Sequence, residues 1–155
     1  MSSNQMKWLW SLTALALLIM LLYLGNHLQE LTQVDDTRVP GCVVTEGSCI
    51  VEISPEQRLK ISLSPWPILA LQPVSYTVAA EGIGLESARL ALTGKNMYMG
   101  IHQYTMMADA SQQQLNVTGT ISVCTERVMP WRGRMDLETS NGPQQVWFDF
   151  NVHQY

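Results

Sequence analysis

RLKISLS, residues 58–64, alternates large apolar side chains with polar ones along its whole length. Successive side chains of a β-strand point to opposite faces, so Leu59, Ile61 and Leu63 would share one face turned toward a core. Six other stretches alternate or run apolar at strand length, and they are residues 51–53, 74–80, 87–93, 114–123, 134–139 and 145–152. The pattern therefore predicts an all-β domain.

Turn-forming residues separate these stretches, and they lie at 54–55, 65–67, 81–82, 109–112 and 141–143. Short strands at near-regular spacing with turns between them are typical of a β-sandwich or barrel. Residues 41–155 are enough for one such domain and no more. We expect an immunoglobulin-like β-sandwich of about seven to eight strands in this range.

An apolar segment precedes the β-rich region. WLWSLTALALLIMLLYLG, residues 8–25, has no charged side chain and carries Trp and Tyr near its two ends. About twenty such residues span a bilayer as a helix, and aromatic rings favour the membrane interface. A cleaved signal peptide is the alternative, but no Ala-x-Ala pattern follows the run. We expect residues 1–26 to form a cytoplasmic leader and a transmembrane helix. Residues 27–40 would be a linker, either a stalk or a continuation of the helix.

Charge indicates where the domain lies and what it does not bind. Lys7 precedes the apolar run and acidic residues follow it, which favours a cytoplasmic amino terminus. The sequence thus predicts a single-pass protein of the inner (plasma) membrane with a periplasmic carboxyl-terminal domain. Its formal charge is −4 and it has no basic cluster, whereas nucleic-acid binding needs a basic surface. Nucleic acid is therefore excluded as a partner.

Two of the three cysteines are spaced for a disulfide. Cys42 and Cys49 enclose VVTEGS, whose EGS predicts a turn between two short strands. Such a hairpin brings two cysteines within disulfide distance, and an oxidising compartment favours the bond. Cys124 is then left over, either as a free or as a reactive thiol.

Six of the nine methionines lie in one region together with Cys124, beginning with NMYMG. Thioether and thiolate sulfur select Cu(I) over harder ions, and Met97 and Met99 would face the same way on a strand. We expect Met97, Met99, Cys124 and Met129 to bind Cu(I), with His102 as an accessory ligand. The competing interpretation is that these methionines fill the core.

No familiar catalytic motif is present. The chain lacks G-x-S-x-G, a glycine-rich phosphate loop and H-E-x-x-H. A nucleophilic Cys124 beside a histidine is the remaining catalytic alternative, and a small β-sandwich without an obvious cleft argues against it. We therefore do not expect an enzyme.

Four pieces of sequence support a family resemblance, and they are C-x6-C at 42–49, LSPWPI at 63–68, MYMG at 97–100 and VCTERVM at 123–129. In this order they resemble a group of proteobacterial single-pass membrane proteins with a periplasmic immunoglobulin-like domain. These are similar in outline to the FixH and YtkA-like families, which are associated with cytochrome oxidase assembly or copper handling. The resemblance implies a respiratory oxidase as partner and the same four sulfur residues as the functional ones. It departs after Met129, where Pro130 precedes Trp131.

The leading hypothesis is a membrane-anchored periplasmic domain that binds or delivers Cu(I) during cytochrome oxidase assembly. The alternative is a non-catalytic immunoglobulin-like docking module of a membrane complex, with the methionines in its core. A thiol-redox role for Cys124 is a third possibility. The first two differ in whether the sulfur atoms converge on one place or spread through the core.

Overall fold

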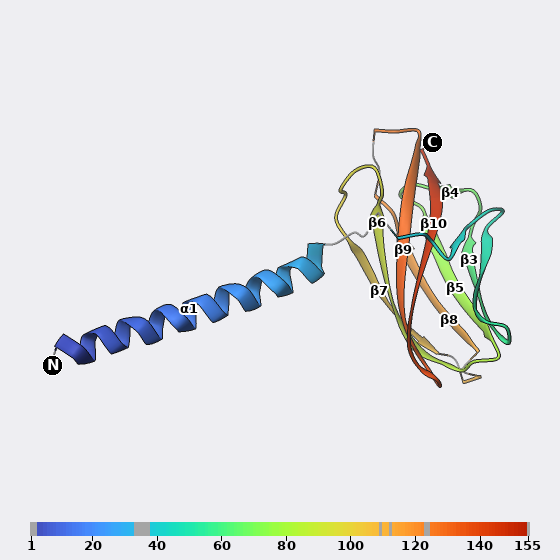
Figure 1. Ribbon diagram of the computed structural model, residues 1–155. Helices are drawn as coiled ribbons and strands as arrows, with labels where there is room; N and C mark the ends of the chain where they lie inside the picture. Colours follow the sequence, from blue (N-terminus) through green and yellow to red (C-terminus); the bar gives the residue numbers. More distant parts are fainter. Residues whose placement is uncertain (1–2, 33–37, 109, 112, 123–124, 155) are drawn as a thin grey trace. The chain divides into compact units, whose positions relative to one another are not determined.

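A computed structural model of the protein describes residues 3–32, 38–108, 110–111, 113–122 and 125–154. The chain forms two compact units, Met1–Asp36 and Thr37–Tyr155. The first unit is a helix and the second is β-rich (Figure 1).

Helix α1 extends over Ser3–Thr32. Leucine, a good helix former, is by far its commonest residue, and no proline interrupts it. Ser11 and Thr13 donate their hydroxyl protons to carbonyls one turn earlier, at 2.9 and 3.0 Å, so these two polar groups are satisfied within the helix. The helix continues past residue 26, so residues 27–32 of the expected linker continue the helix, while residues 33–37 lie outside the described part.

Every side chain from Trp10 to Gly25 in α1 is exposed. Among the residues that the structure describes, no helix is long and apolar enough to cross a membrane.

The second unit confirms the all-β prediction but has ten described strands, more than the seven to eight expected. They are β1 Cys42–Val43, β2 Ser48–Ser54, β3 Gln57–Ser64, β4 Ile68–Leu69, β5 Pro73–Glu81, β6 Leu85–Gly94, β7 His102–Ala108, β8 Gln114–Thr120, β9 Val128–Thr139 and β10 Gly142–His153.

The strands are hydrogen-bonded in the order β1-β10-β9-β6-β7-β8-β5-β3-β2, with β4 also beside β10. Among the described residues, only the pairs Met107↔Asn116 and Ala108↔Leu115 join β7 to β8, so the sheet folds over at this point. One layer contains β1, β10, β9, β6 and β7, and the other contains β8, β5, β3 and β2 (Figure 1). The arrangement is sandwich-like.

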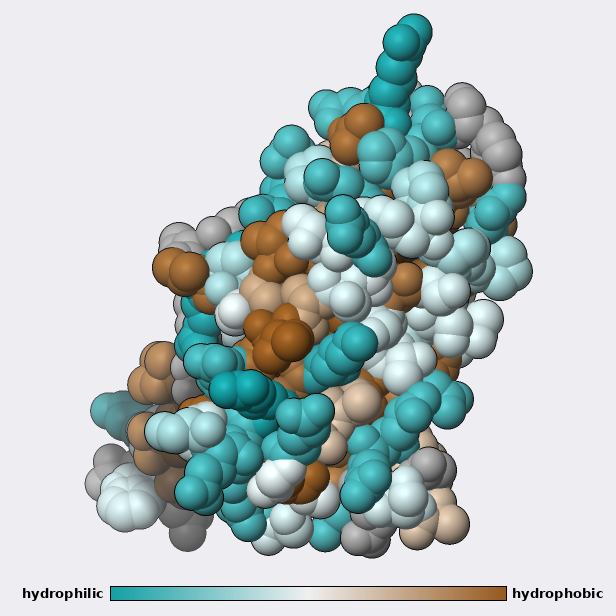
Figure 2. All heavy atoms as spheres, turned by 90° about the vertical axis from the view of Figure 1, so that its right-hand side faces the viewer, coloured by the Kyte–Doolittle hydropathy of each residue, from teal (hydrophilic) through white to brown (hydrophobic). Residues whose placement is uncertain are grey.

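The core lies between the two layers, as the alternating patterns require. Leu59, Ile61 and Leu63 of β3 are at most 2 % exposed, which confirms the face predicted from RLKISLS. The opposite layer contributes Trp131 and Phe148, which are fully buried. The outer face is polar between scattered apolar residues, as Figure 2 shows for the side at the right in Figure 1.

The predicted disulfide between Cys42 and Cys49 is present, with the two Cα atoms 5.9 Å apart. Glu46 and Gly47 have φ values of 54° and 83°, which is the backbone of a tight two-residue turn. The hairpin is shorter than expected, because β1 pairs in parallel with β10 and only Thr45 bridges to Ser48. The bond therefore ties β1 of one layer to β2 of the other.

Candidate functional site

Met97 and Met99 lie on the loop that connects β6 to β7, so the prediction that they share one face of a strand is wrong. The loop leaves β6 after Gly94 and turns back toward β9, where the Lys95 amide donates to the Pro130 carbonyl at 3.0 Å. It turns again at Gly100, whose φ of 79° suits glycine far better than other residues. Gly94, the tethered Lys95 and Gly100 therefore keep Met97 and Met99 out of a strand.

The same loop forms one wall of a pocket with β9. The lining residues are Gly94, Asn96, Met97, Met99, Glu126, Met129 and Pro130. The pocket is open to solvent, and its volume of about 10 Å³ has room for about one water molecule, so it is shallow. Three of the four predicted sulfur residues, Met97, Met99 and Met129, line this pocket together, although Met97 and Met129 are 32 positions apart in the chain.

The three methionines differ in how far they reach into the protein. Met129 is 6 % exposed and belongs to the core, Met99 is half-buried against that core, and Met97 is 48 % exposed. The pocket therefore has a buried floor and an open rim. A thioether at each depth provides soft, uncharged donor atoms, which suit a soft cation better than a hard one.

Glu126 is a lining residue that sequence reasoning missed. It is exposed, and it precedes β9 by two positions. Its carboxylate supplies the only formal charge among the lining residues that the structure describes. The sequence offers one indication of it, because Glu126 lies between Cys124 and Met129.

The structure describes His102 but not Cys124, the two other residues predicted to bind the metal. The His102 Nε2 atom lies 3.2 Å from the Ser122 hydroxyl, and its ring meets Trp131 edge-on with centroids 5.5 Å apart. His102 is not among the pocket-lining residues. Cys124 lies outside the described residues, so its predicted role as the thiolate ligand stays a prediction.

The remaining methionines of this region separate clearly from the pocket. Met106 and Met135 are fully buried in the core, so the core-filling interpretation holds for them. Met107 is 69 % exposed on β7 and does not line the pocket. Composition alone could not sort these six side chains, because methionine serves in cores and in metal sites alike.

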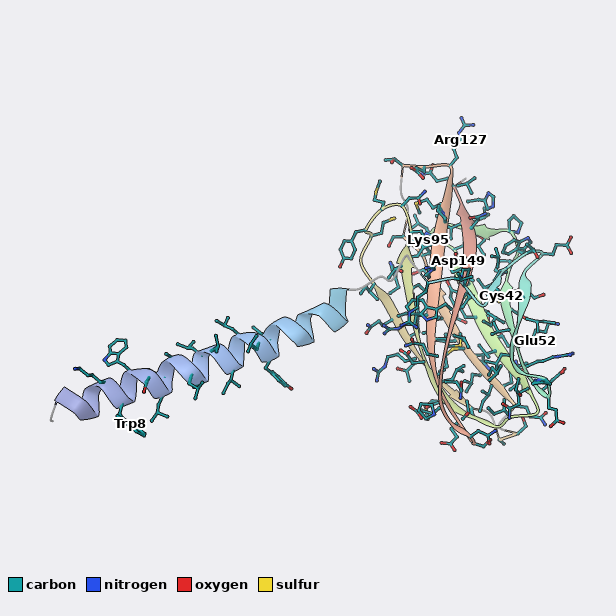
Figure 3. All side chains as sticks on the ribbon, in the orientation of Figure 1. Trp8, Cys42, Glu52, Lys95, Arg127 and Asp149 are labelled. Carbon is teal, nitrogen blue, oxygen red and sulfur yellow. A yellow bond between two sulfur atoms is a disulfide. The ribbon has the colours of Figure 1, made fainter. Side chains whose placement is uncertain are left out.

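A buried charge cluster lies beside the pocket, and no pattern in the sequence indicates it. Arg132 of β9 donates from Nε and Nη2 to the Asp149 carboxylate of β10, at 2.8 and 3.0 Å. The Lys95 ammonium reaches the same carboxylate at 2.6 Å, and Figure 3 shows the two side chains together. Burial raises the pKa of Asp149, but hydrogen bonds from Arg132 and Lys95 lower it by more, so the pKa falls below its ordinary value.

Within the described ranges, no three His, Cys, Asp or Glu side chains form a group that could hold a metal ion. No protein-family model matches the chain, and no curated protein matches it significantly.

Proposed function

We propose that this chain is a membrane-anchored, extracytoplasmic domain that binds Cu(I) and delivers it to a membrane complex such as a respiratory oxidase, without catalysis. The observation that carries the proposal is the pocket lined by Met97, Met99 and Met129. Thioether sulfur favours Cu(I) and is a poor ligand for Mg²⁺ or Ca²⁺. A shallow rim suits a carrier, because a metal held there stays within reach of a partner.

In this proposal the three thioethers are the ligands that define the site. Cys124 supplies a thiolate, and its place two positions before the lining residue Glu126 supports that role. The Glu126 carboxylate offsets the positive charge of the metal from the pocket wall. His102 is an accessory ligand at most, since its Nε2 atom already faces Ser122.

We propose a membrane anchor because the apolar side chains of α1 are exposed. Apolar side chains between Leu12 and Leu24 are exposed on every side of α1, including Ile19 at 59 % and Leu22 at 67 %. Trp8 (Figure 3), Trp10 and Tyr23 are exposed near the two ends of the uncharged run. A helix that is apolar all round is expected to be covered, and lipid is the cover that such a run fits. The disulfide supports an extracytoplasmic location, because such bonds persist in oxidising compartments.

We infer that the β-domain is immunoglobulin-like. Two features support this assignment: a parallel β1–β10 pair at the edge of one layer, and the connections β5 to β6 and β8 to β9, which cross from one layer to the other. Crossing connections of this kind build the Greek-key arrangement of such sandwiches.

A docking module is the second candidate, and the exposed residues of the same loop favour it. Tyr98 is 78 % exposed and Ile101 is 37 % exposed, next to Met97 at the pocket rim. Exposed aromatic and methionine side chains are enriched at protein interfaces. In this case the loop would contact a partner protein and the pocket would bind no metal.

An anaerobic Cu(I) titration of the full chain against a competing chelator separates the two candidates. Met97→Leu conserves volume but removes one thioether, and we expect it to weaken Cu(I) binding roughly tenfold or more, as changes around metal sites do. Met107→Leu is the matched control, because it removes an exposed thioether outside the pocket. No binding by the wild type, or equal losses in the two variants, would favour the docking module.

A further inference from the structure

The charge cluster beside the pocket has two cationic side chains, those of Arg132 and Lys95, for the single carboxylate of Asp149. The side chains of Arg132 and Asp149 are 3 % and 12 % exposed, and they face each other in register on β9 and β10. Their two hydrogen bonds give each oxygen of the buried carboxylate one donor. Lys95 is the third member, its side chain is 30 % exposed, and it comes from the loop after β6.

Lys95 is held at two points. Its amide donates to the Pro130 carbonyl on β9 at 3.0 Å, and its ammonium donates to Asp149 on β10 at 2.6 Å. Its chain neighbours Gly94 and Asn96 both line the pocket, and Pro130 lines the opposite wall. The first residue of the loop is therefore fixed both to β9, whose residues Met129 and Pro130 line the pocket, and to the neighbouring strand β10.

Close backbone packing carries this constraint on to the methionines. A Cβ atom placed on Gly94 would lie 2.6 Å from the Met97 carbonyl oxygen and 3.9 Å from the Met99 Cγ atom. The loop thus folds directly back over the end of β6, so we expect a shift at Lys95, the next residue, to displace Met97 and Met99 relative to Met129.

We propose that Lys95 is a positioning residue, whose ion pair with Asp149 holds the β6–β7 loop so that the Met97 and Met99 thioethers face Met129. The inference rests on the proposed Cu(I) function for its binding consequence, but the position of the loop can be measured without any metal. The fold itself has little need of Lys95, because Arg132 compensates Asp149.

The test compares Lys95→Gln with Lys95→Arg and with Lys60→Gln in the full chain, purified in detergent micelles. Lys60 is an exposed lysine on β3 in the other layer, so it controls for loss of one charge. Three quantities are measured: the methionine methyl NMR spectrum without metal, the thermal midpoint, and the Cu(I) affinity against a competing chelator.

Lys95→Gln is expected to shift and sharpen the Met97 and Met99 methyl signals and to leave those of Met106 and Met135 in place. It should weaken Cu(I) binding roughly 10- to 100-fold, as loss of a supporting contact around a metal site does, with little change in thermal midpoint. Lys95→Arg should restore both readouts in large part, and Lys60→Gln should match the wild type.

Unchanged methyl signals in Lys95→Gln would overturn the inference, and so would a collapse of the thermal midpoint, which would make Lys95 a structural residue. If the wild type binds no Cu(I) but the methyl signals of the loop move, the positioning role stands and the proposed function fails. If the wild type and Lys95→Gln bind Cu(I) equally, the function stands and the positioning role fails.

Discussion

Asp149 shows how one residue links the core to the candidate site. It is a carboxylate in the middle of a strand whose neighbours, Phe148 and Phe150, are buried aromatic residues. An unpaired buried charge is strongly unfavourable, whereas a carboxylate that accepts hydrogen bonds from Arg132 and Lys95 is tolerated. Removing one partner of such a cluster is costly, because the other charge then stays buried without compensation.

Asp149→Asn should lower the free energy of unfolding by about 3–5 kcal/mol near neutral pH, the usual cost of breaking a buried ion pair. Because the folded state lowers the pKa of Asp149, this contribution is present above the unfolded value of about 3.9 and is lost as pH falls through the lower folded value. The difference between wild type and variant should therefore shrink in acid. Urea unfolding at a series of pH values measures it.

Asp136→Asn is the control for the acid experiment. Asp136 lies on the same strand as Arg132, but its side chain is 37 % exposed beside Arg134. Exposed pairs contribute about 0–1 kcal/mol, so this variant should stay close to wild type at every pH. Equal behaviour of the two variants would contradict the buried-cluster account.

The sequence predicted the apolar core better than it predicted the pairing of charged side chains. Leu59, Ile61 and Leu63 followed from alternation alone, because a strand period of two is a local property. The pairing of Asp149 with Lys95 depends on which strands lie side by side, and no local pattern contains that information. Glu126 was not predicted as a pocket residue for the same reason, since the pocket is assembled from two distant segments.

At the scale of elements, the β6–β7 loop decides what the methionines can do. Gly94→Ala places a Cβ atom 2.6 Å from the Met97 carbonyl oxygen, so the loop must move. We expect a loss of about 1–3 kcal/mol in unfolding free energy, the usual cost of overpacking, together with weaker Cu(I) binding. Chemical denaturation and chelator competition measure the two effects.

Gly84→Ala tests whether any glycine substitution would do the same. Its added Cβ atom would meet Ser140 at 3.4 Å, which is nearly ordinary contact. This variant should keep its Cu(I) affinity and nearly all of its stability. A Gly94→Ala protein that is as stable and binds as tightly as Gly84→Ala would contradict the described loop.

The strand predictions missed residues where apolar side chains do not alternate, which are β7 and the first half of β9. HQYTMMA has no clear apolar alternation, yet it forms β7, whose Tyr104 and Met106 turn inward between exposed neighbours. The start of β9 contains Pro130 and Gly133, which ordinarily interrupt strands. Pro130 lies beyond the last β6–β9 pair, Gly94↔Trp131, and the Phe148 ring covers Gly133, where a Cβ atom would collide with it.

At the scale of the whole molecule, the two units differ in their apolar side chains, which form a buried core in the β-rich unit and are exposed on α1. All the buried core residues that the structure describes lie in the second unit, between Val44 and Val152. The exposed apolar side chains of α1 contribute nothing to that core. The fold of the β-domain should therefore be independent of the helix.

Deleting Met1–Gly25 should yield a soluble domain with a strand-rich circular dichroism spectrum and a single thermal transition. Its midpoint should equal that of the β-domain in the full chain held in detergent micelles. An insoluble product, or a spectrum dominated by helix, would contradict both the anchor and the independent domain.

The copper K-edge X-ray absorption spectrum of the full chain, loaded anaerobically with one equivalent of Cu(I), tests the central claim most directly. We predict sulfur neighbours around copper, and fewer of them in a Met97→Leu, Met99→Leu double variant but not in Met107→Leu. A spectrum with only nitrogen and oxygen neighbours, or sulfur neighbours that persist unchanged in the double variant, would contradict the claim that this pocket binds Cu(I).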